Sequence, residues 1–290
     1  MNAQSRRHHS VIVGVDPSDE ARRALHWAAA EAQRRRWPMQ IVHAVQTDDQ
    51  GVAQKIVDTA LADVRAAWPG VDVMGESVAD DTATALARTA TDRDILVVGS
   101  RGLGRIASVL VGSVSSAVAR HATCPVVVVR DPNTLPRHPE STSGVILGVD
   151  GSEASISAAG FAFEAASLRG RPLTVVHAVW DPYTESQAVV AILSDPERVV
   201  VDDSELLDVA EAVAGWRELY PDVKVVTRYE NGRPDRVLGE LSDGADLLVV
   251  GARGRGPAAT LLLGSVSRRV LQRASCPVAV VRRRPRERSR

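Results

Sequence analysis

Short apolar runs alternate with stretches of helical periodicity along this chain. In the first half, the pattern predicts strands at Val11–Val15, Gln40–Val45, Val71–Val78, Ile95–Val98 and Val126–Val129. It predicts helices between them at Asp19–Arg35, Ala53–Trp68, Thr82–Thr91 and Ser113–Arg120. Unbroken Val, Ile and Leu runs between helices are typical of a parallel sheet covered on both faces. We therefore expect an α/β fold with a doubly wound, flavodoxin-like or Rossmann-like parallel sheet.

The second half of the chain repeats the first, which predicts two tandem copies of this domain. Val11–Ala32 matches Val145–Ala166 at an offset of 134 residues, and Ile95–Arg130 matches Leu247–Arg282 at an offset of 152. The 18 additional residues of the second copy are expected within Asp181–Glu205. The predicted divisions are an N-terminal tail (1–10), domain 1 (11–130), a linker (131–143), domain 2 (144–283) and a basic C-terminal tail (284–290).

We expect the two domains to pair within the chain about a pseudo-twofold axis. The last strand of each copy could mark the domain edge where the two copies meet. Such pairing would imitate a dimer of single domains. A homodimer of the whole chain is also open at this stage, and so is the identity of any protein partner.

Composition excludes several classes of protein. The formal net charge is −1 and aromatic residues make up 3%, which argues against a nucleic-acid partner. The first ten residues lack the apolar core of a signal peptide and no apolar run approaches a membrane span, so we expect a cytoplasmic protein without a membrane partner. Cys124 and Cys276 occupy matching repeat positions, and we interpret them as small buried hydrophobes.

The glycine-rich loop after the fourth strand of each copy is the strongest candidate site. Gly99 and Gly102 would permit positive φ and close backbone approach, and Gly112-Ser113 would present free N–H groups at a helix start, where the dipole favours anions. If the first and fourth strands are neighbours, Asp16 faces this loop across one crevice. Phosphate could then be held by amides and hydroxyls, with Asp16 available to a ribose hydroxyl or a metal. Its alternative role is an Asx-turn or helix cap.

Two better-known fingerprints fail here. Gly102-x-Gly104-x-x-Ala107 imitates the dinucleotide-binding motif but follows the fourth strand, and no acidic residue ends the next strand. Gly99-x4-Gly104 imitates a P-loop, but Arg105-Ile106 replaces the required Lys-Ser/Thr pair.

A longer pattern, G-x2-G-x9-G-[ST], occurs in both copies, at Gly99, Gly102, Gly112 and Ser113 and again at Gly251, Gly254, Gly264 and Ser265. With G-V-D at the first strand, V-H-A-V at the second and C-P-V at the last, the chain resembles the universal stress protein family in its tandem form. The resemblance covers nearly the whole chain outside the tails and linker. It implies an ATP-binding, nucleotide-dependent stress-response protein with one ATP site per domain and ATP as cofactor, usually together with Mg²⁺.

The resemblance also implies the site residues. Those near the adenosine would be Gly14, Asp16 and Ala44, with the backbone at Ala44 reading the adenine edge. The ribose and phosphates would be wrapped by Gly99, Ser100, Arg101, Gly102, Leu103, Gly104 and Arg105, and held by Gly112, Ser113 and Val114. The second copy offers Gly148, Asp150, Ala178, Gly251, Ala252, Arg253, Gly254, Arg255, Gly256, Gly264, Ser265, Val266 and Ser267. Asp80-Asp81-Thr82 departs from the Gly-x-Pro form that the second copy keeps at Asn231–Pro234.

The sequence offers a nucleotide cradle without a catalytic set. No paired carboxylates, nucleophile–base pair or P-loop Lys stands out, and His43 and His177 are interpreted as core residues on buried strands. We therefore name no catalytic and no metal-binding side chain, and expect a regulatory protein with at most weak ATP hydrolysis. A slow ATPase or nucleotide hydrolase on the same scaffold is the alternative, and a scaffold that no longer binds nucleotide is a third.

Overall fold

The computed structural model describes residues 9–45, 50–100, 112–130, 143–180, 203–254 and 263–282. The predicted linker, both predicted tails for the most part, and the inserted stretch up to residue 202 lie outside these residues. No helix in the described ranges is long and apolar enough to cross a membrane.

Each half of the chain forms the alternating strands and helices that its sequence predicts. The first half contains β1 (Val11–Gly14), α1 (Asp19–Arg35), β2 (Met39–Val45), α2 (Gln50–Ala67), β3 (Val73–Ala79), α3 (Thr82–Thr89), β4 (Ile95–Gly99), α4 (Ser113–His121) and β5 (Val126–Val129). The second contains β6 (Val145–Gly148), α5 (Glu153–Arg169), β7 (Leu173–Val179), α7 (Asp203–Leu219), β8 (Val225–Asn231), α8 (Pro234–Leu241), β9 (Leu247–Gly251), α9 (Ser265–Arg273) and β10 (Val278–Val281).

The strands of both halves join in one ten-stranded sheet, in the order β3-β2-β1-β4-β5-β10-β9-β6-β7-β8. Pairing is parallel within each half and antiparallel between β5 and β10, where Val128 lies opposite Val278. The order reads alike from either edge, which confirms that the two copies meet at their last strands. β1 pairs with both β2 and β4, so the loops after β1 and β4 leave the sheet side by side.

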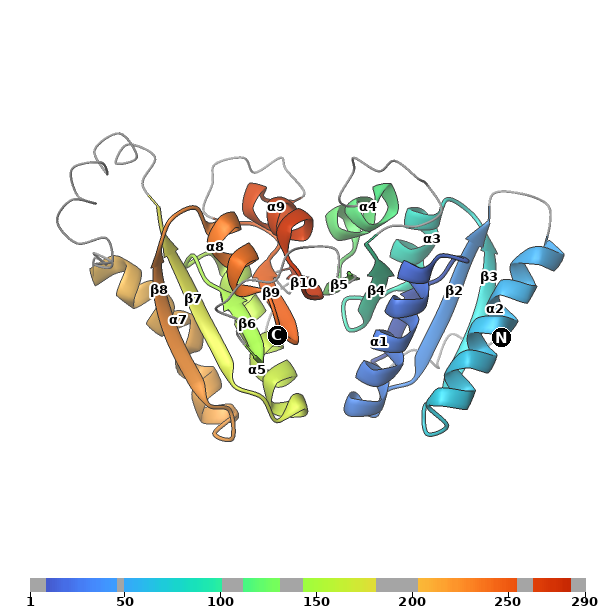
Figure 1. The fold of residues 1–290 in the computed structure, drawn as a ribbon, viewed down its shortest axis with the longest axis horizontal. Coiled ribbons are helices and arrows are strands. Elements are labelled where there is room, and N and C mark those ends of the chain that lie inside the picture. Colours follow the sequence, from blue (N-terminus) through green and yellow to red (C-terminus); the bar gives the residue numbers. More distant parts are fainter. Residues whose placement is uncertain are drawn as a thin grey trace, which may run out of the picture.

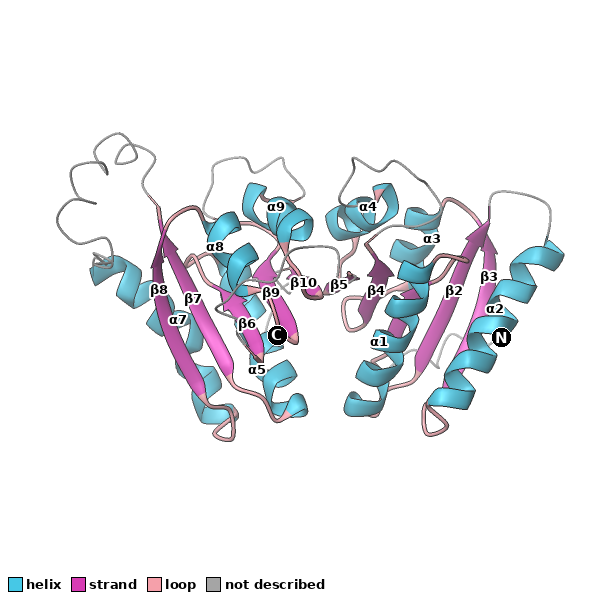
Figure 2. Ribbon diagram, in the orientation of Figure 1, coloured by secondary structure: helices cyan, strands magenta, loops and turns pink. Residues whose placement is uncertain are grey.

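Helices cover the two faces of the sheet in separate layers (Figures 1 and 2). One apolar core lies beneath α1, α2, α5 and α7, and the other beneath α3, α4, α8 and α9. Figure 1 shows α4 and α9 together above the central strands, with α1 and α5 below them.

The two ends of α1 and α5 have the same stabilising features. Ser18 caps α1 by accepting from the Ala21 amide, and Ser152 caps α5 by accepting from the Ser155 amide. Acidic residues stand in the first turn of each helix and arginine in the last, which complements the helix dipole.

A buried cluster of charges joins α1 to α5 across the domain boundary. The fully buried Glu31 carboxylate lies 2.6 Å from Arg35 Nε and 2.6 Å from Arg169 Nη2. Arg35 Nη1 lies 2.7 Å from Glu164 Oε2, and its guanidinium carbon sits 5.3 Å from the Phe161 ring centroid. Arg35 and Arg169 are matching positions of the repeat, so one carboxylate holds the same arginine from both copies.

Candidate functional site: two matching loop pockets

Each domain has a pocket where the loops after its first and fourth strands meet the fourth helix. The first, of about 200 Å³, is lined by Gly14, Val15, Asp16, Ala21, His43, Ala44, Thr82, Leu86, Val98, Gly99, Gly112, Ser113, Val114 and Ser115. The second, of about 480 Å³, is lined by Gly148, Val149, Asp150, Ser155, Val176, Ala178, Pro234, Leu238, Val250, Gly251, Arg253, Gly254, Gly264, Ser265, Val266 and Ser267. The structure thus brings together the predicted Asp and the flanks of the predicted glycine loop.

Part of the predicted loop lies outside the described residues. This holds for Arg101, Gly102, Leu103, Gly104 and Arg105 in the first copy, and for Arg255 and Gly256 in the second. The contact of these residues with a ligand stays a prediction.

Asp16 and Asp150 hold the start of the following helix while lining their pockets. Asp16 Oδ1 accepts from the backbone and hydroxyl of Ser18, with 2.9 Å between Ser18 N and Oδ1. Asp150 Oδ1 accepts in the same way from Ser152, at 3.1 Å from N and 2.6 Å from Oγ. The turn role that the sequence left open is therefore present in both copies, and it fixes each carboxylate at the edge of its pocket.

The loop after β9 packs closely on Asp150. A Cβ at Gly254 would clash with Asp150 Oδ2, so glycine lets the loop pass this carboxylate without displacing its side chain. The Ser152 hydroxyl also lies 3.1 Å from the Arg253 carbonyl oxygen. These contacts join the end of β6, the start of α5 and the loop into one wall of the second pocket.

The helices α4 and α9 begin without a side-chain cap. Gly112 and Gly264 are their N-cap residues, and neither helix has an acidic residue in its first turn. Ser113 and Val114 line the first pocket, and Ser265 and Val266 the second. The first-turn amides and the positive end of the helix dipole are thus directed at each pocket, which is an arrangement suited to an anion.

Two details of the predicted loop are corrected by the structure. The amides of Gly112 and Gly264 are not free, because they donate to the carbonyl oxygens of Ser100 and Ala252 at 2.7 and 2.8 Å. The φ of Gly99 is not positive. Glycine is needed there because the end of β4 comes close to the start of α1, where a Cβ would lie 2.9 Å from the Glu20 carbonyl carbon. The available donors are therefore one residue further along the helix than the glycine.

Ser100 and Ala252 do not line the pockets, although the prediction included them. Both are buried and stand behind the loop, where their amides donate to Val129 and Val281 of the last strands. Their carbonyl oxygens also accept from the Ser115 and Ser267 hydroxyls. The hydrogen bonds at this position are made by the backbone and not by the side chain, which explains why one copy has serine there and the other alanine.

The sequence reasoning missed the contribution of α3 and α8 to the pockets. Thr82 and Leu86 line the first pocket, and Pro234 and Leu238 line the second. Gly14 packs directly on Leu86, because a Cβ at Gly14 would lie 2.7 Å from Leu86 Cδ1. The only signal for this wall was the departure between Asp80–Thr82 and Asn231–Pro234.

The histidines and cysteines belong to the core, as predicted. His43 and His177 are buried, with Nδ1 at 2.8 and 2.9 Å from the carbonyl oxygens of Val15 and Val149. Burial raises the pKa of the Cys124 thiol to about 12, with Asp94 adding to the effect, and burial raises the pKa of Cys276 to about 12. Neither thiol is suited to act as a nucleophile.

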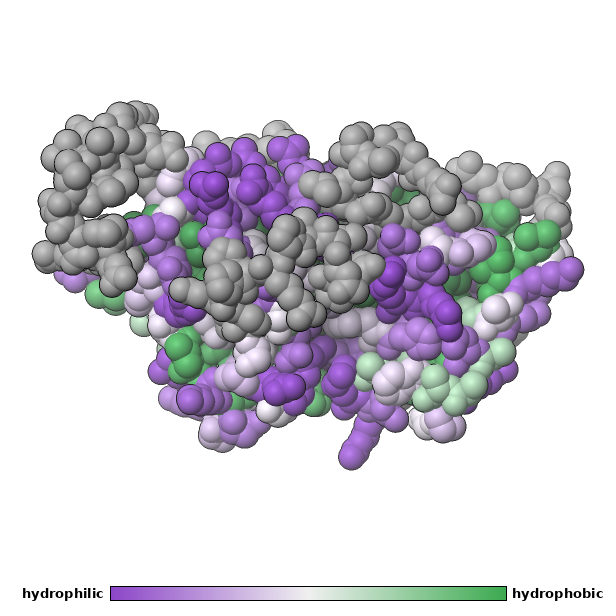
Figure 3. Space-filling view, viewed as in Figure 1, coloured by the Kyte–Doolittle hydropathy of each residue, from purple (hydrophilic) through white to green (hydrophobic). Residues whose placement is uncertain are grey.

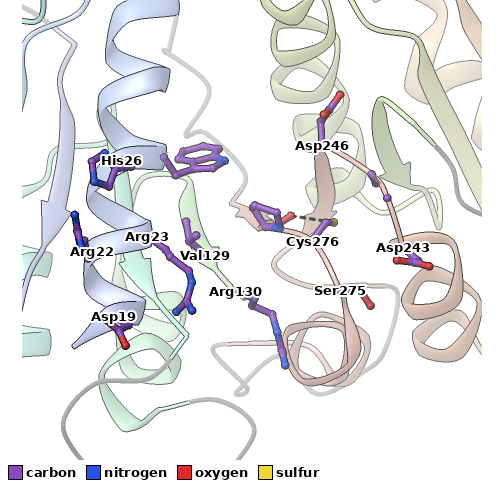
Figure 4. A pocket seen from close by; sticks show the side chains of 14 residues that line it. Asp19, Arg22, Arg23, His26, Val129, Arg130, Asp243, Asp246, Ser275 and Cys276 are labelled. Carbon is purple, nitrogen blue, oxygen red and sulfur yellow. Dashed lines mark hydrogen bonds between the residues drawn. The ribbon is translucent and has the colours of Figure 1, made fainter. Parts of the chain in front are cut away.

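A third cavity, of about 980 Å³, lies between the domains and was not predicted. Figure 4 shows Arg22 and His26 of α1 on one side, and Asp243 and Asp246 before β9 on the other. Arg22 and His26 already contact Asp63 of α2, at 3.4 and 3.2 Å. The cavity contains none of the predicted site residues.

Comparison with known proteins places the chain among close relatives over nearly its full length. The universal stress protein family matches residues 8–130 and again 143–282. A universal stress protein of Mycobacterium tuberculosis is 36% identical, covering 94% of this chain and 96% of its own. Another, from Mycolicibacterium smegmatis, is 35% identical and covers 97% and 99%. Among solved structures, a universal stress protein from Archaeoglobus fulgidus superposes with a TM-score of 0.65 at 19% identity, covering 94% of this chain and 96% of that one.

Proposed function

Because this chain belongs to the universal stress protein family, in its tandem form, we propose that it is a regulatory protein that binds one ATP in each loop pocket. The observation that carries the proposal is the repeated, uncapped helix start facing a pocket edged by an aspartate. A cradle of this kind binds a phosphate chain through backbone amides and leaves the carboxylate for a ribose hydroxyl.

The pockets suit holding a nucleotide better than consuming it. Asp16 and Asp150 are the carboxylates that line them, and each already accepts hydrogen bonds from the serine two residues on. His43 faces a carbonyl oxygen through Nδ1. His43 lines the first pocket together with Asp16. The turn and backbone contacts of the two groups favour a positioning role over activation of a water molecule.

Mg²⁺ is compatible with this arrangement only as a partner of the phosphates. No group of three His, Cys, Asp or Glu side chains in the described residues converges on a possible ion. Mg²⁺ characteristically keeps its waters and uses one or two carboxylates together with substrate phosphates. Asp16 and Asp150 are the side chains that would supply such a carboxylate.

The first test is the nucleotide content and turnover of the purified protein. We expect ATP to be released on denaturation and identified by mass spectrometry, and calorimetry on stripped protein to give two sites per chain. The purified protein should hydrolyse its bound ATP only slowly. Absence of ATP binding at either site would refute the proposal, and rapid turnover abolished by Asp16→Ala and Asp150→Ala would replace it with an enzyme.

The second test removes one site at a time. A Cβ at Gly264 would lie 3.3 Å from Ser267 Oγ and 3.4 Å from the Ala252 carbonyl oxygen, so alanine fits, though tightly. We expect Gly264→Ala to hinder approach of phosphate and reduce the calorimetric stoichiometry from two to one, and Gly112→Ala to do the same in the first domain. Unchanged stoichiometry in the double variant would exclude the phosphate cradle.

A further inference from the structure

Three arginines surround a buried aspartate beside the second pocket. Asp235 of α8 is 2% exposed, and its carboxylate lies 3.3 Å from Arg233 Nη2, 3.6 Å from Arg269 Nη1 and 3.3 Å from Arg273 Nε. We call these four residues the α8–α9 arginine cluster. Figure 3 shows hydrophilic surface in the region of α8 and α9, the two helices to which these residues belong.

The cluster carries net positive charge that reaches solvent. One carboxylate faces three guanidinium groups, whose side chains are 39%, 41% and 52% exposed for Arg233, Arg269 and Arg273. The buried carboxylate also restrains the arginines, so less side-chain freedom is lost when an anion approaches them.

The cluster stands at the rim of the second pocket. Arg233 immediately precedes Pro234, which lines that pocket, and is the N-cap residue of α8. Arg269 is one helical turn beyond Ser265, whose first-turn position on α9 also lines it. The positive charge therefore lies next to the helix start that faces the pocket.

The matching rim of the first pocket has the opposite charge. At an offset of 152 residues, Asp81 stands in place of Arg233, and Ala83, Ala117 and His121 replace the other three members. Asp81 caps α3 by accepting from the Thr84 amide at 3.1 Å. Asp80 beside it pairs at 3.3 Å with Arg88, whose side chain is 77% exposed. The two carboxylates outnumber this single arginine.

We propose that the two sites differ in selectivity: the second prefers nucleotides with a longer, more negatively charged phosphate chain, and the first discriminates little between them. This inference rests on the proposed function, because it concerns the same two pockets. The physical cause is the field of the rim arginines, of which Arg269 is one helical turn from Ser265 and Arg233 adjoins Pro234. Charges at such short separations are only partly screened by salt. Such a field acts more strongly on a triphosphate than on a monophosphate.

The test compares ATP and AMP at each site separately. Gly112→Ala leaves the second site and Gly264→Ala leaves the first, and calorimetry gives the ratio of ATP to AMP affinity in each protein. We expect this ratio to be about fivefold larger at the second site in about 50 mM salt. The difference should shrink in about 500 mM salt, because exposed charges are then screened.

Exchanging rim residues between the two copies tests whether the arginines cause the difference in the ATP-to-AMP ratio. In the second-site protein, Arg269→Ala with Arg273→His introduces two residues of the first copy and should lower the ratio toward the first-site value. Arg217→Ala, on α7 at the opposite face of the sheet, removes positive charge far from the pocket and should leave the ratio unchanged. If the loss of partners for Asp235 unfolds the variant, the reverse change is decisive: Ala117→Arg with His121→Arg in the first-site protein should raise the ratio.

The outcomes are distinguishable. Equal ratios at the two sites, insensitive to salt and to these exchanges, would overturn the inference and leave nucleotide binding intact. Binding of neither nucleotide to the wild-type chain would refute the proposed function, and this inference with it.

Discussion

In the loop between β9 and α9, the glycine at each end has a different structural role. Gly251 ends β9 against the start of α5, where a Cβ would lie 2.8 Å from Ala154 C and 2.8 Å from Ser155 N. Both neighbours are backbone atoms, which cannot move aside without shifting the helix. Gly264, at the other end, has looser surroundings and borders the pocket. The first glycine is thus required for packing, and the second is the one that we propose admits the phosphates.

Gly251→Ala should therefore destabilise the protein, by about 1–3 kcal/mol, because the methyl group overpacks a backbone contact. The matched control is Gly215→Ala in α7, where a Cβ would meet no atom within 4 Å. That change should raise stability by about 0.5–1 kcal/mol, since a helix-interior glycine is replaced by alanine. Urea denaturation of both variants checks the pair. Equal effects at the two positions would contradict the packing role.

At the scale of secondary-structure elements, α1 and α5 end in the same geometry with different residues. The C-cap of α5 is Gly170 at φ 59°, whereas the C-cap of α1 is Arg36 at φ 55°. Both lie in the left-handed region, which costs a non-glycine residue about 1–2 kcal/mol. Arg36 is exposed, so its side chain has no place in the core that would offset this cost.

Arg36→Gly should consequently stabilise the protein, by up to about 1 kcal/mol once the extra freedom of glycine in the unfolded chain is subtracted. Gly170→Arg, the reciprocal change in α5, should destabilise it by a similar amount. Thermal unfolding followed by circular dichroism would measure both. A lower melting temperature for Arg36→Gly would show that the helix end is held by contacts of the arginine instead.

Most elements could be predicted from the sequence because each depends on local patterns. The bounds of α1 and of Val126–Val129 agree with the structure, since a serine cap and an unbroken apolar run mark them plainly. The predicted start of α2 was three residues late, at Ala53 instead of Gln50, because its first turn is exposed and contains a glycine. The roles of Leu86 and Leu238 were not predictable, since they depend on how α3 and α8 pack over β1 and β6.

At the scale of the whole molecule, the α1–α5 charge cluster connects the two domains. Burial alone would raise the pKa of the Glu31 carboxyl, but the guanidinium groups of Arg169 and Arg35 outweigh burial and hold it below its ordinary value. Arg35 and Arg169 are separated from solvent almost as completely as Glu31, with side chains 1% and 6% exposed. The charged form of Glu31 is thus part of the folded state.

Glu31→Gln should lower the free energy of unfolding by about 3–5 kcal/mol near neutral pH, because it leaves the buried Arg169 guanidinium without a carboxylate and Arg35 with Glu164 alone. The lowered pKa means that the wild-type advantage is complete above the unfolded-state pKa of about 4.3 and is lost as pH falls through the folded-state value. The difference in melting temperature between the two proteins should therefore be constant around neutral pH and shrink below about pH 4.

The matched control is Glu240→Gln, which changes an exposed pair with Arg236 at 3.6 Å. It should cost less than about 0.5 kcal/mol. A difference between wild type and Glu31→Gln that grows on acidification would contradict the assigned charge state of Glu31.

Contacts between the domains were beyond sequence reasoning, apart from the meeting of the last strands. Glu31 and Arg169 are 138 residues apart, and nothing in the local pattern of either helix indicates that they touch. The α8–α9 arginine cluster within the second domain was equally unpredictable from the sequence, since Asp235 and Arg273 lie on different helices. The repeat predicted that the copies would resemble each other; the structure locates where they differ.

The position of Glu31 also bears on how such a protein can evolve. In a symmetric dimer of identical chains, a carboxylate between the two matching arginines would face its own copy across the axis. Here the matching residue of the second half is Ala165, and one carboxylate serves both arginines. Two copies joined in one chain permit this, because each copy can then change without the other. The same independence would let one of the two proposed nucleotide sites respond at a different cellular concentration from the other, giving a single chain two thresholds.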